Sequence, residues 1–223
     1  MSDSTGATLA MRRPLMATRD LGKYLKPAVF ALALVPFVLL VVRAFSDDLG
    51  ANPVEKIEHV TGLWALRFLL ITLSITPLRR LTHWNTPARL RRMLGLFAFF
   101  YVCLHFSTWL VFDHSLDVAE MLKDIRKRPY ITVGFSAFVL LIPLAITSTN
   151  AMLKRLGGAR WRRLHSTVYV IGTLAILHFL WLVKADKREP IFYGAILITL
   201  LVLRLPAMLK PPPTASRVTS QSG

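Results

Sequence analysis

The chain has 223 residues, of which 54% are hydrophobic, and a formal net charge of +16. Its mean hydropathy of +0.49 is high for a soluble domain of this length, so the composition favours a membrane protein. The Lys and Arg residues form short clusters between apolar runs, which is a pattern of membrane orientation and not of nucleic-acid binding. Cys103 is the single cysteine, which excludes an internal disulfide and a thiolate-held zinc or iron–sulfur cluster.

Six apolar runs predict six membrane-spanning helices, because each has about the length needed to cross roughly 30 Å of hydrocarbon. We therefore predict an all-α polytopic membrane protein, a six-transmembrane-helix bundle over residues 23–209. Residues 1–22 are predicted to be a disordered tail and residues 210–223 a second tail. The six runs are 26–45, 62–79, 94–112, 130–147, 164–184 and 190–208.

The loop charges predict the orientation of the bundle. The loops after the second and fourth runs are rich in Arg and contain no acid, whereas ten of the 12 Asp and Glu residues lie in the alternate loops. Because Lys and Arg concentrate on the cytoplasmic side, both termini are predicted to be cytoplasmic. The third and fifth helices then both run from inside to outside.

His105 and His178 are the central candidates for function. His105 lies about 16 Å into the third span and His178 about 21 Å into the fifth, at 1.5 Å per residue. Two imidazoles at one depth on parallel helices are the arrangement that bis-histidine ligation of a b-type haem requires. Two alternatives remain: packed polar side chains, and proton relays in a membrane transporter. Zinc is disfavoured because no carboxylate or thiolate lies at that depth.

His165 and Arg67 are secondary candidates. His165 lies 13 residues before His178, so on an ideal helix the two side chains are about 140° apart. It is predicted either to serve an inner redox site (a second haem, a quinone or a flavin) or to be an interfacial polar residue. A second haem lacks an obvious partner, since the position 14 residues before His105 is Arg91. Arg67 is predicted either to pair with a haem propionate or to extend to the outer interface.

Several ordered motifs resemble one known family, from about residue 26 to 205. The motifs are ANPVEKIEHVTG, ITPLRRL, RRMLGLFAFFYVCLHFSTW, RPYITVG, LAITSTNAMLKRLGGARWRRLHSTVYV and LHFLWLVKAD. Together they are similar to the MsrQ/YedZ family, the haem-binding membrane subunits of bacterial periplasmic methionine-sulfoxide reductase systems, within the ferric-reductase-like transmembrane superfamily.

The resemblance implies a function in transmembrane electron transfer, in a bacterial inner membrane. It implies b-type haem, one or two, linked to His105, His165 and His178, with FMN as an associated cofactor. Electrons would come from the quinone pool or a cytoplasmic flavin reductase. They would pass to a periplasmic molybdopterin enzyme that reduces methionine sulfoxide in oxidised envelope proteins. The sequence departs from the wider superfamily in lacking a fourth haem histidine and a nucleotide-binding domain, so we expect an electron-transfer subunit and not the substrate-reducing one.

Overall fold

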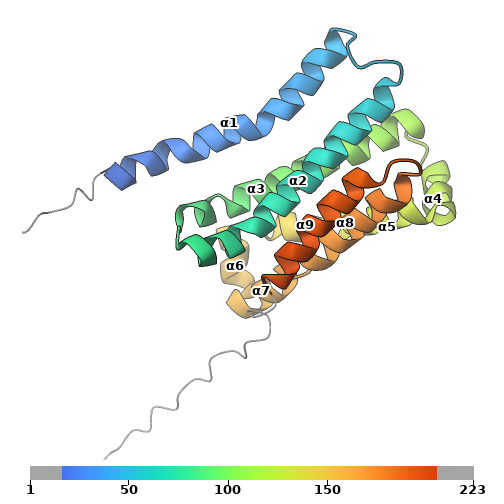
Figure 1. Cartoon of the computed structure of the whole chain (residues 1–223). Coiled ribbons are helices and arrows are strands. Elements are labelled where there is room, and N and C mark those ends of the chain that lie inside the picture. Colours follow the sequence, from blue (N-terminus) through green and yellow to red (C-terminus); the bar gives the residue numbers. More distant parts are fainter. Residues whose placement is uncertain (1–16, 205–223) are drawn as a thin grey trace, which may run out of the picture. The chain divides into compact units, whose positions relative to one another are not determined.

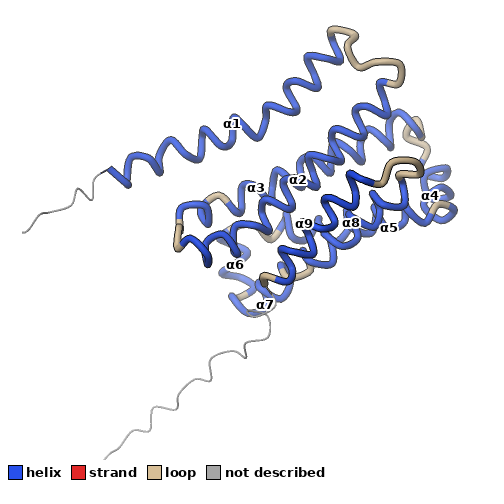
Figure 2. The backbone as a smooth tube through the Cα atoms, viewed as in Figure 1, coloured by secondary structure: helices blue, strands red, loops and turns tan. Residues whose placement is uncertain are grey.

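The computed structural model of the chain describes residues 17–204, and within that range the secondary structure is helical without strands (Figure 2). The chain divides into two compact units, one ending at Gly50 and the other beginning at Ala51. The first contains one described helix, α1 (Ala17–Phe45). The helices of the second are α2 (Pro53–Thr82), η1 (Thr86–Arg89), α3 (Arg91–Thr108), η2 (Trp109–Asp113), α4 (Val118–Lys127), α5 (Pro129–Ile146), α6 (Asn150–Leu156), α7 (Gly158–His165), α8 (Val168–Leu182) and α9 (Arg188–Val202) (Figure 1).

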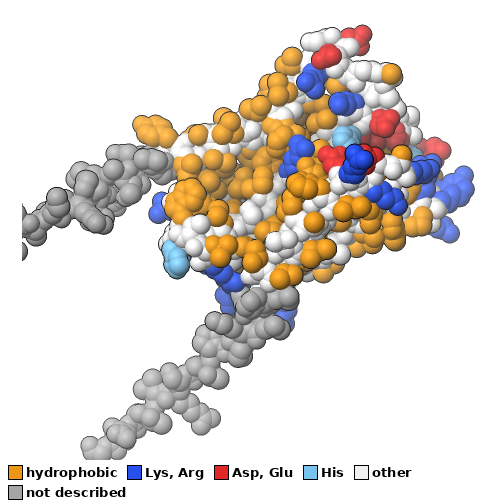
Figure 3. Space-filling model, in the orientation of Figure 1, with side chains coloured by type: hydrophobic (Ala, Val, Ile, Leu, Met, Phe, Trp, Pro, Cys, Tyr) orange, Lys and Arg blue, Asp and Glu red, His pale blue; other side chains and the backbone are white. Residues whose placement is uncertain are grey.

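Five segments of the described chain are long and apolar enough to cross a membrane. They correspond to the first five predicted runs, although several begin earlier than the sequence suggested. The protein is therefore a multi-pass membrane protein, as predicted. Hydrophobic side chains cover much of the visible face of the molecule, as expected for a lipid-facing surface (Figure 3). The five segments are Tyr24–Phe45, Pro53–Thr82, Arg91–Asp113, Pro129–Ile146 and Gly158–Leu182.

The sixth predicted span, 190–208, is only partly described. Its helix, α9, has 15 residues, and the residues beyond 204 lie outside the described part of the chain. The count of six spans and the cytoplasmic position of both termini therefore stay predictions. The two predicted tails fall largely outside the described residues, except that α1 begins at Ala17, within the segment predicted to be a tail.

Local sequence explains the limits of α2. Asn52 caps its first turn by accepting a hydrogen bond from the backbone N–H of Glu55 at 3.3 Å, and Pro53 occupies the first helical position, where its missing N–H costs nothing. The helix ends at His83, whose φ of +56° is a left-handed terminating conformation. The intervening 30 residues are longer than the predicted run 62–79, because the polar first turns of the helix are not apolar enough to signal it.

Helix α2 is the central packing element of the second unit. Against α3 it stacks Phe68 on Tyr101 and Phe97, with ring centroids 5.4 and 5.6 Å apart. Against α8 and α9 it contributes to an apolar core in which Leu73 and Leu197 are almost fully buried. These contacts use the apolar stripes of the helices, and they fix how α2, α3, α8 and α9 pack together. The core residues are Leu66, Leu70, Leu73, Tyr193, Leu197 and Leu200.

The helices of the second unit alternate in direction, which defines its two ends. Helices α2 and α5 begin at the end where α4 lies, and α3 and α8 finish there, while α6 and α7 lie at the opposite end (Figure 1). We call the first the α4 end. Residues late in α3 and α8 are thereby brought level with residues early in α2 and α5.

Candidate functional site

The structure brings His105 of α3 and His178 of α8 together near the α4 end. The centroids of their imidazole rings are 6.2 Å apart, and the ring planes make an angle of 76°. The predicted juxtaposition of the two rings is therefore observed.

Each of these rings makes one hydrogen bond, to a backbone carbonyl of a different helix. His105 Nδ1 lies 3.0 Å from the carbonyl oxygen of Glu58 in α2, and His178 Nδ1 lies 2.7 Å from that of Tyr130 in α5. A carbonyl can only accept a hydrogen bond, so we assign the proton to Nδ1 in both rings. The opposite nitrogen, Nε2, then keeps its lone pair, which is the arrangement found for metal-binding histidines.

Two glycines give the rings room to approach. A Cβ atom at Gly134 would stand 2.6 Å from His178 Nδ1, and one at Gly62 would stand 3.1 Å from His105 Nδ1. Each glycine lies four residues after the residue whose carbonyl holds the ring, Gly62 after Glu58 and Gly134 after Tyr130. Because residues i and i+4 share a helix face, the glycine clears the space over the carbonyl. The same local device therefore holds both imidazoles.

The geometry fits one metal held between two imidazoles. A metal–imidazole nitrogen bond of about 2 Å on each side places the two ring centroids roughly 6 Å apart, close to the observed separation. Among residues 17–204, no group of three or more His, Cys, Asp or Glu side chains could hold a metal ion. The two histidines therefore suit a metal whose other ligands come from a macrocycle, as in haem, better than a tetrahedral zinc ion.

His165 lies apart from this pair, at the end of α7. Thr147 Oγ1 is 3.0 Å from its Nε2, and the Trp161 ring stacks on the imidazole with centroids 3.8 Å apart. Trp161 Nε1 in turn donates to the carbonyl of Thr147 at 3.0 Å. The helix is interrupted between His165 and Val168, so the ideal-helix angle predicted between His165 and His178 does not strictly apply. His165 thus belongs to a separate polar cluster with Thr147 and Trp161.

Arg67 faces α9. Its Nε donates to the hydroxyl of Tyr193 at 2.8 Å, and its guanidinium lies 4.9 Å from the centroid of the Trp64 ring. Arg67 follows Gly62 by five residues in α2, which places it about 7.5 Å along the helix axis from the glycine that accommodates His105. Its Nε is therefore committed to Tyr193 and not to the histidine pair.

Comparison with known proteins identifies the family. The ferric reductase like transmembrane component family matches residues 61–177. Proteins called protein-methionine-sulfoxide reductase heme-binding subunit MsrQ align over most of the chain. The relative from Herminiimonas arsenicoxydans is 61% identical over 81% of this chain and 84% of its own length. Those from Ralstonia nicotianae and Xanthomonas euvesicatoria are 57% and 52% identical, over 80% and 86% of this chain and 83% and 90% of their own lengths.

The chain belongs to the MsrQ family. The segment that matches the broader ferric-reductase-like family includes Gly62, His105, Gly134 and His165, and it ends one residue before His178. The resemblance noted from the sequence motifs is thereby confirmed.

Sequence reasoning did not find several groups that the MsrQ fold places around the histidine pair. It missed Gly62 and the carbonyls of Glu58 and Tyr130, because a backbone acceptor has no signature of its own. Gly134 accommodates the His178 ring, and a Cβ atom at Gly172 would stand 3.2 Å from Leu197 Cδ1 of α9. The available signal was the shared spacing of Glu58 with Gly62 and Tyr130 with Gly134.

Proposed function

We propose that this chain is a haem-binding transmembrane electron-transfer subunit, with His105 and His178 as the axial ligands of a b-type haem. The observation that supports this most directly is the pair of rings 6.2 Å apart, each with Nδ1 held by a backbone carbonyl. The relatives are themselves named haem-binding subunits, which agrees with the proposal.

The bound haem would supply one-electron chemistry between ferric and ferrous iron. The residues of the chain hold and tune the group. The carbonyls of Glu58 and Tyr130 fix the orientation of the two imidazoles and increase their basicity, and Gly62 and Gly134 let the rings approach. If both His105 and His178 held the haem iron, neither would be free to leave a place for substrate, so the site would suit electron transfer.

The path of electrons follows from the proposed orientation in a bacterial inner membrane. The α4 end, near the histidine pair, would face the periplasm and deliver electrons to a separate molybdopterin-containing methionine-sulfoxide reductase. The opposite end, with His165 and the Arg-rich segments, would receive electrons from the quinone pool or a cytoplasmic flavin reductase. FMN or a second haem near His165 would serve this inner side. A free Nη of Arg67 would be available to a haem propionate.

The test is a haem and flavin assay on the purified chain in detergent. We expect a pyridine haemochrome spectrum of b-type haem from the unaltered protein. His105→Ala and His178→Ala should each abolish the main Soret absorbance, because each removes one axial ligand. The control is His83→Asn, at an exposed histidine whose left-handed conformation Asn tolerates.

Two results would reject the proposal. Full haem content and unchanged spectra in both alanine variants would exclude His105 and His178 as ligands. A colourless unaltered protein that couples proton flux to transport would support the rival function, in which the two histidines relay protons.

A further inference from the structure

Helix α4 lies between the end of α3 and the start of α5, at the α4 end of the second unit (Figure 1). It is a short helix of 10 residues, and Ile125 is its buried apolar residue. It begins at an N-cap, Asp117, whose carboxylate accepts hydrogen bonds from the backbone N–H groups of Ala119 and Glu120 at 2.9 and 3.1 Å. The contacts that α4 makes with its two neighbours connect the helices that position the paired histidines.

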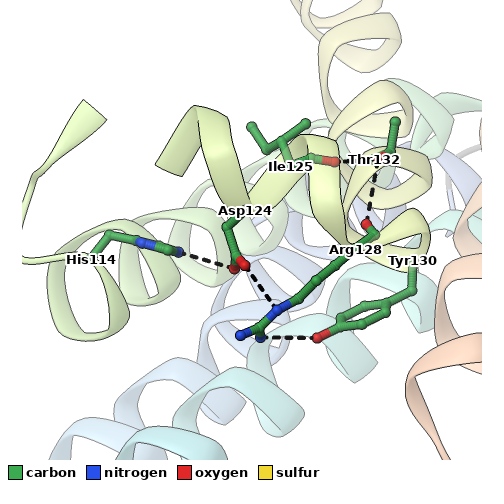
Figure 4. Close-up of polar contacts among 6 residues, drawn as sticks. All are labelled: His114, Asp124, Ile125, Arg128, Tyr130 and Thr132. Carbon is green, nitrogen blue, oxygen red and sulfur yellow. Dashed lines mark hydrogen bonds and ion pairs between the residues drawn. The ribbon is translucent and has the colours of Figure 1, made fainter. Parts of the chain in front are cut away.

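On the α5 side, polar contacts span the junction at Arg128, the residue between α4 and α5. Asp124 Oδ1 accepts from Arg128 Nε at 2.8 Å, and Arg128 Nη1 donates to the Tyr130 hydroxyl at 3.2 Å. The hydroxyl of Thr132 donates to the carbonyl of Ile125. Figure 4 shows these side chains converging on the first turn of α5. That turn is the one whose Tyr130 carbonyl accepts from His178 Nδ1.

On the α3 side, α4 contacts His114, which follows the π-helical segment η2 at the end of α3. The His114 side chain is only 7% exposed, and its Nε2 lies 3.4 Å from Asp124 Oδ2. Trp109 packs against the His114 ring with centroids 4.5 Å apart. Asp124 therefore lies between a group attached to α3 and a group attached to α5.

We propose that Asp124 and Arg128 are positioning residues that hold His178 at its working distance and angle from His105, and thereby set the reduction potential of the haem. This inference rests on the proposed function. The route runs from His114 through Asp124 and Arg128 to Tyr130, whose carbonyl holds the His178 ring. Asp124 and Arg128 act on the His178 ring through Tyr130, whose hydroxyl accepts from Arg128 and whose carbonyl accepts from His178.

The hydrogen bond at His178 Nδ1 determines whether the midpoint potential of the haem should rise or fall in the variants. A short bond to a carbonyl makes the imidazole a stronger donor to the metal, which favours the ferric form. If the first turn of α5 loosens, the bond lengthens and the ferric form loses part of this stabilisation. Loss of either Asp124 or Arg128 should then raise the midpoint potential.

A direct electrostatic effect of the two charges on the haem predicts a different pattern of potential shifts, so the experiment distinguishes it from positioning. Removing the negative charge in Asp124→Asn would raise the potential, but removing the positive charge in Arg128→Gln would lower it. Positioning through Tyr130 predicts an upward shift in both. Tyr130→Phe removes only the hydroxyl that Arg128 holds and changes no charge, so it should also shift the potential upward under positioning and leave it unchanged under a direct electrostatic effect.

The experiment is a redox titration of the haem in the purified, full-length variants, together with electron paramagnetic resonance of the ferric form. We expect haem content equal to that of the unaltered protein, an upward potential shift in Asp124→Asn, Arg128→Gln and Tyr130→Phe, and altered low-spin signals. Arg128→Lys should recover part of the shift, since it keeps the charge and one donor. The matched control is Asp186→Asn, at an exposed acid whose ion pair with the Arg188 side chain is a loose 3.9 Å contact, and whose hydrogen bond from the Arg188 backbone N–H an Asn side chain can also accept.

The outcomes separate this inference from the proposed function. Opposite shifts in Asp124→Asn and Arg128→Gln, or potentials and signals equal to those of Asp186→Asn, would overturn the positioning role while leaving bis-histidine haem binding intact. If the Asp124 and Arg128 variants fail to fold, the midpoint potential of Tyr130→Phe is the deciding measurement. An unchanged potential in that variant rejects the inference. Absence of bis-histidine haem from the unaltered protein would reject the proposed function itself, and this inference with it.

Discussion

Gly134 lies directly against the ring of His178, so that a Cβ atom at Gly134 would stand 2.6 Å from His178 Nδ1. That separation is shorter than real Cβ contacts, and the ring cannot withdraw without losing its hydrogen bond to the carbonyl of Tyr130. The lack of a side chain at position 134 is thus a condition for the position of the imidazole.

Gly134→Ala should therefore reduce haem content strongly, because the added methyl group displaces His178. Gly62→Ala should have a smaller effect, since its Cβ would stand 3.1 Å from His105 Nδ1 and a shift of a few tenths of an ångström relieves the contact. Gly95→Ala is the control: its Cβ would meet Thr72 at 3.7 Å, an ordinary contact, and Ala favours the helix by about 1 kcal/mol. The measurement is haem per protein for each variant. Equal haem content in all three would contradict this description of the site.

His165→Ala should have a partial effect on cofactor content or on haem reduction from the cytoplasmic side. The physical reason is that His165 lies in a cluster separate from the His105–His178 pair, so its loss leaves the two axial imidazoles in place. Haem and flavin assays, and reduction kinetics with a cytoplasmic flavin reductase, measure the effect. Wild-type behaviour in every one of these assays would remove His165 from the redox site.

Thr147→Val tests whether His165 acts on a cofactor through its Nε2 atom or only makes a structural contact with Thr147. The substitution removes the hydroxyl that lies 3.0 Å from His165 Nε2 and keeps a β-branched side chain of similar size. If His165 acts through Nε2, the freed nitrogen should change cofactor affinity in the direction opposite to His165→Ala. If the Thr147 contact is only structural, flavin and haem content should stay at the wild-type values while the thermal stability falls.

Arg67→Gln should lower the thermal stability, because it removes a charged hydrogen bond from α2 to Tyr193 of α9. The loss should be about 1.5–3 kcal/mol, and Tyr193→Phe should reproduce it while keeping the aromatic packing. Apparent unfolding temperatures in detergent test this. A lower haem affinity in Arg67→Gln that is absent in Tyr193→Phe would support the propionate role. Equal haem affinity in the two variants would argue against that role.

Arg204→Met should detach the end of α9 from the bundle. Arg204 is 3% exposed, its Nη1 donates to the Tyr169 hydroxyl at 2.8 Å, and its Nη2 donates to the carbonyl of Leu73. Leaving that buried carbonyl without a donor should cost about 1–3 kcal/mol. Arg188→Met is the control, since the Arg188 side chain is 95% exposed. The two variants are compared by thermal unfolding, and equal unfolding temperatures would show that the buried contacts of Arg204 add nothing.

The sequence alone determined the class of the protein and predicted that its two central histidines lie at one level of the helix bundle. Long apolar runs must form helices in a bilayer, since no water is present there to satisfy the backbone, and a rise of 1.5 Å per residue converts sequence position into depth. Composition and length were therefore sufficient to predict the first five spans. They were also sufficient to place His105 and His178 at one level.

Only the tertiary structure decided which groups meet around those histidines. The carbonyls of Glu58 and Tyr130 are available to imidazoles only because α2 and α5 start where α3 and α8 end. Gly62 and Gly134 matter because of the neighbouring helix that each one faces. The meeting of Asp124 with His114 likewise depends on how α4 folds back beside the end of α3. Sequence position fixes the depth of a residue along its own helix, whereas contacts across helices depend on rotation and packing, which are set by all the neighbouring side chains together.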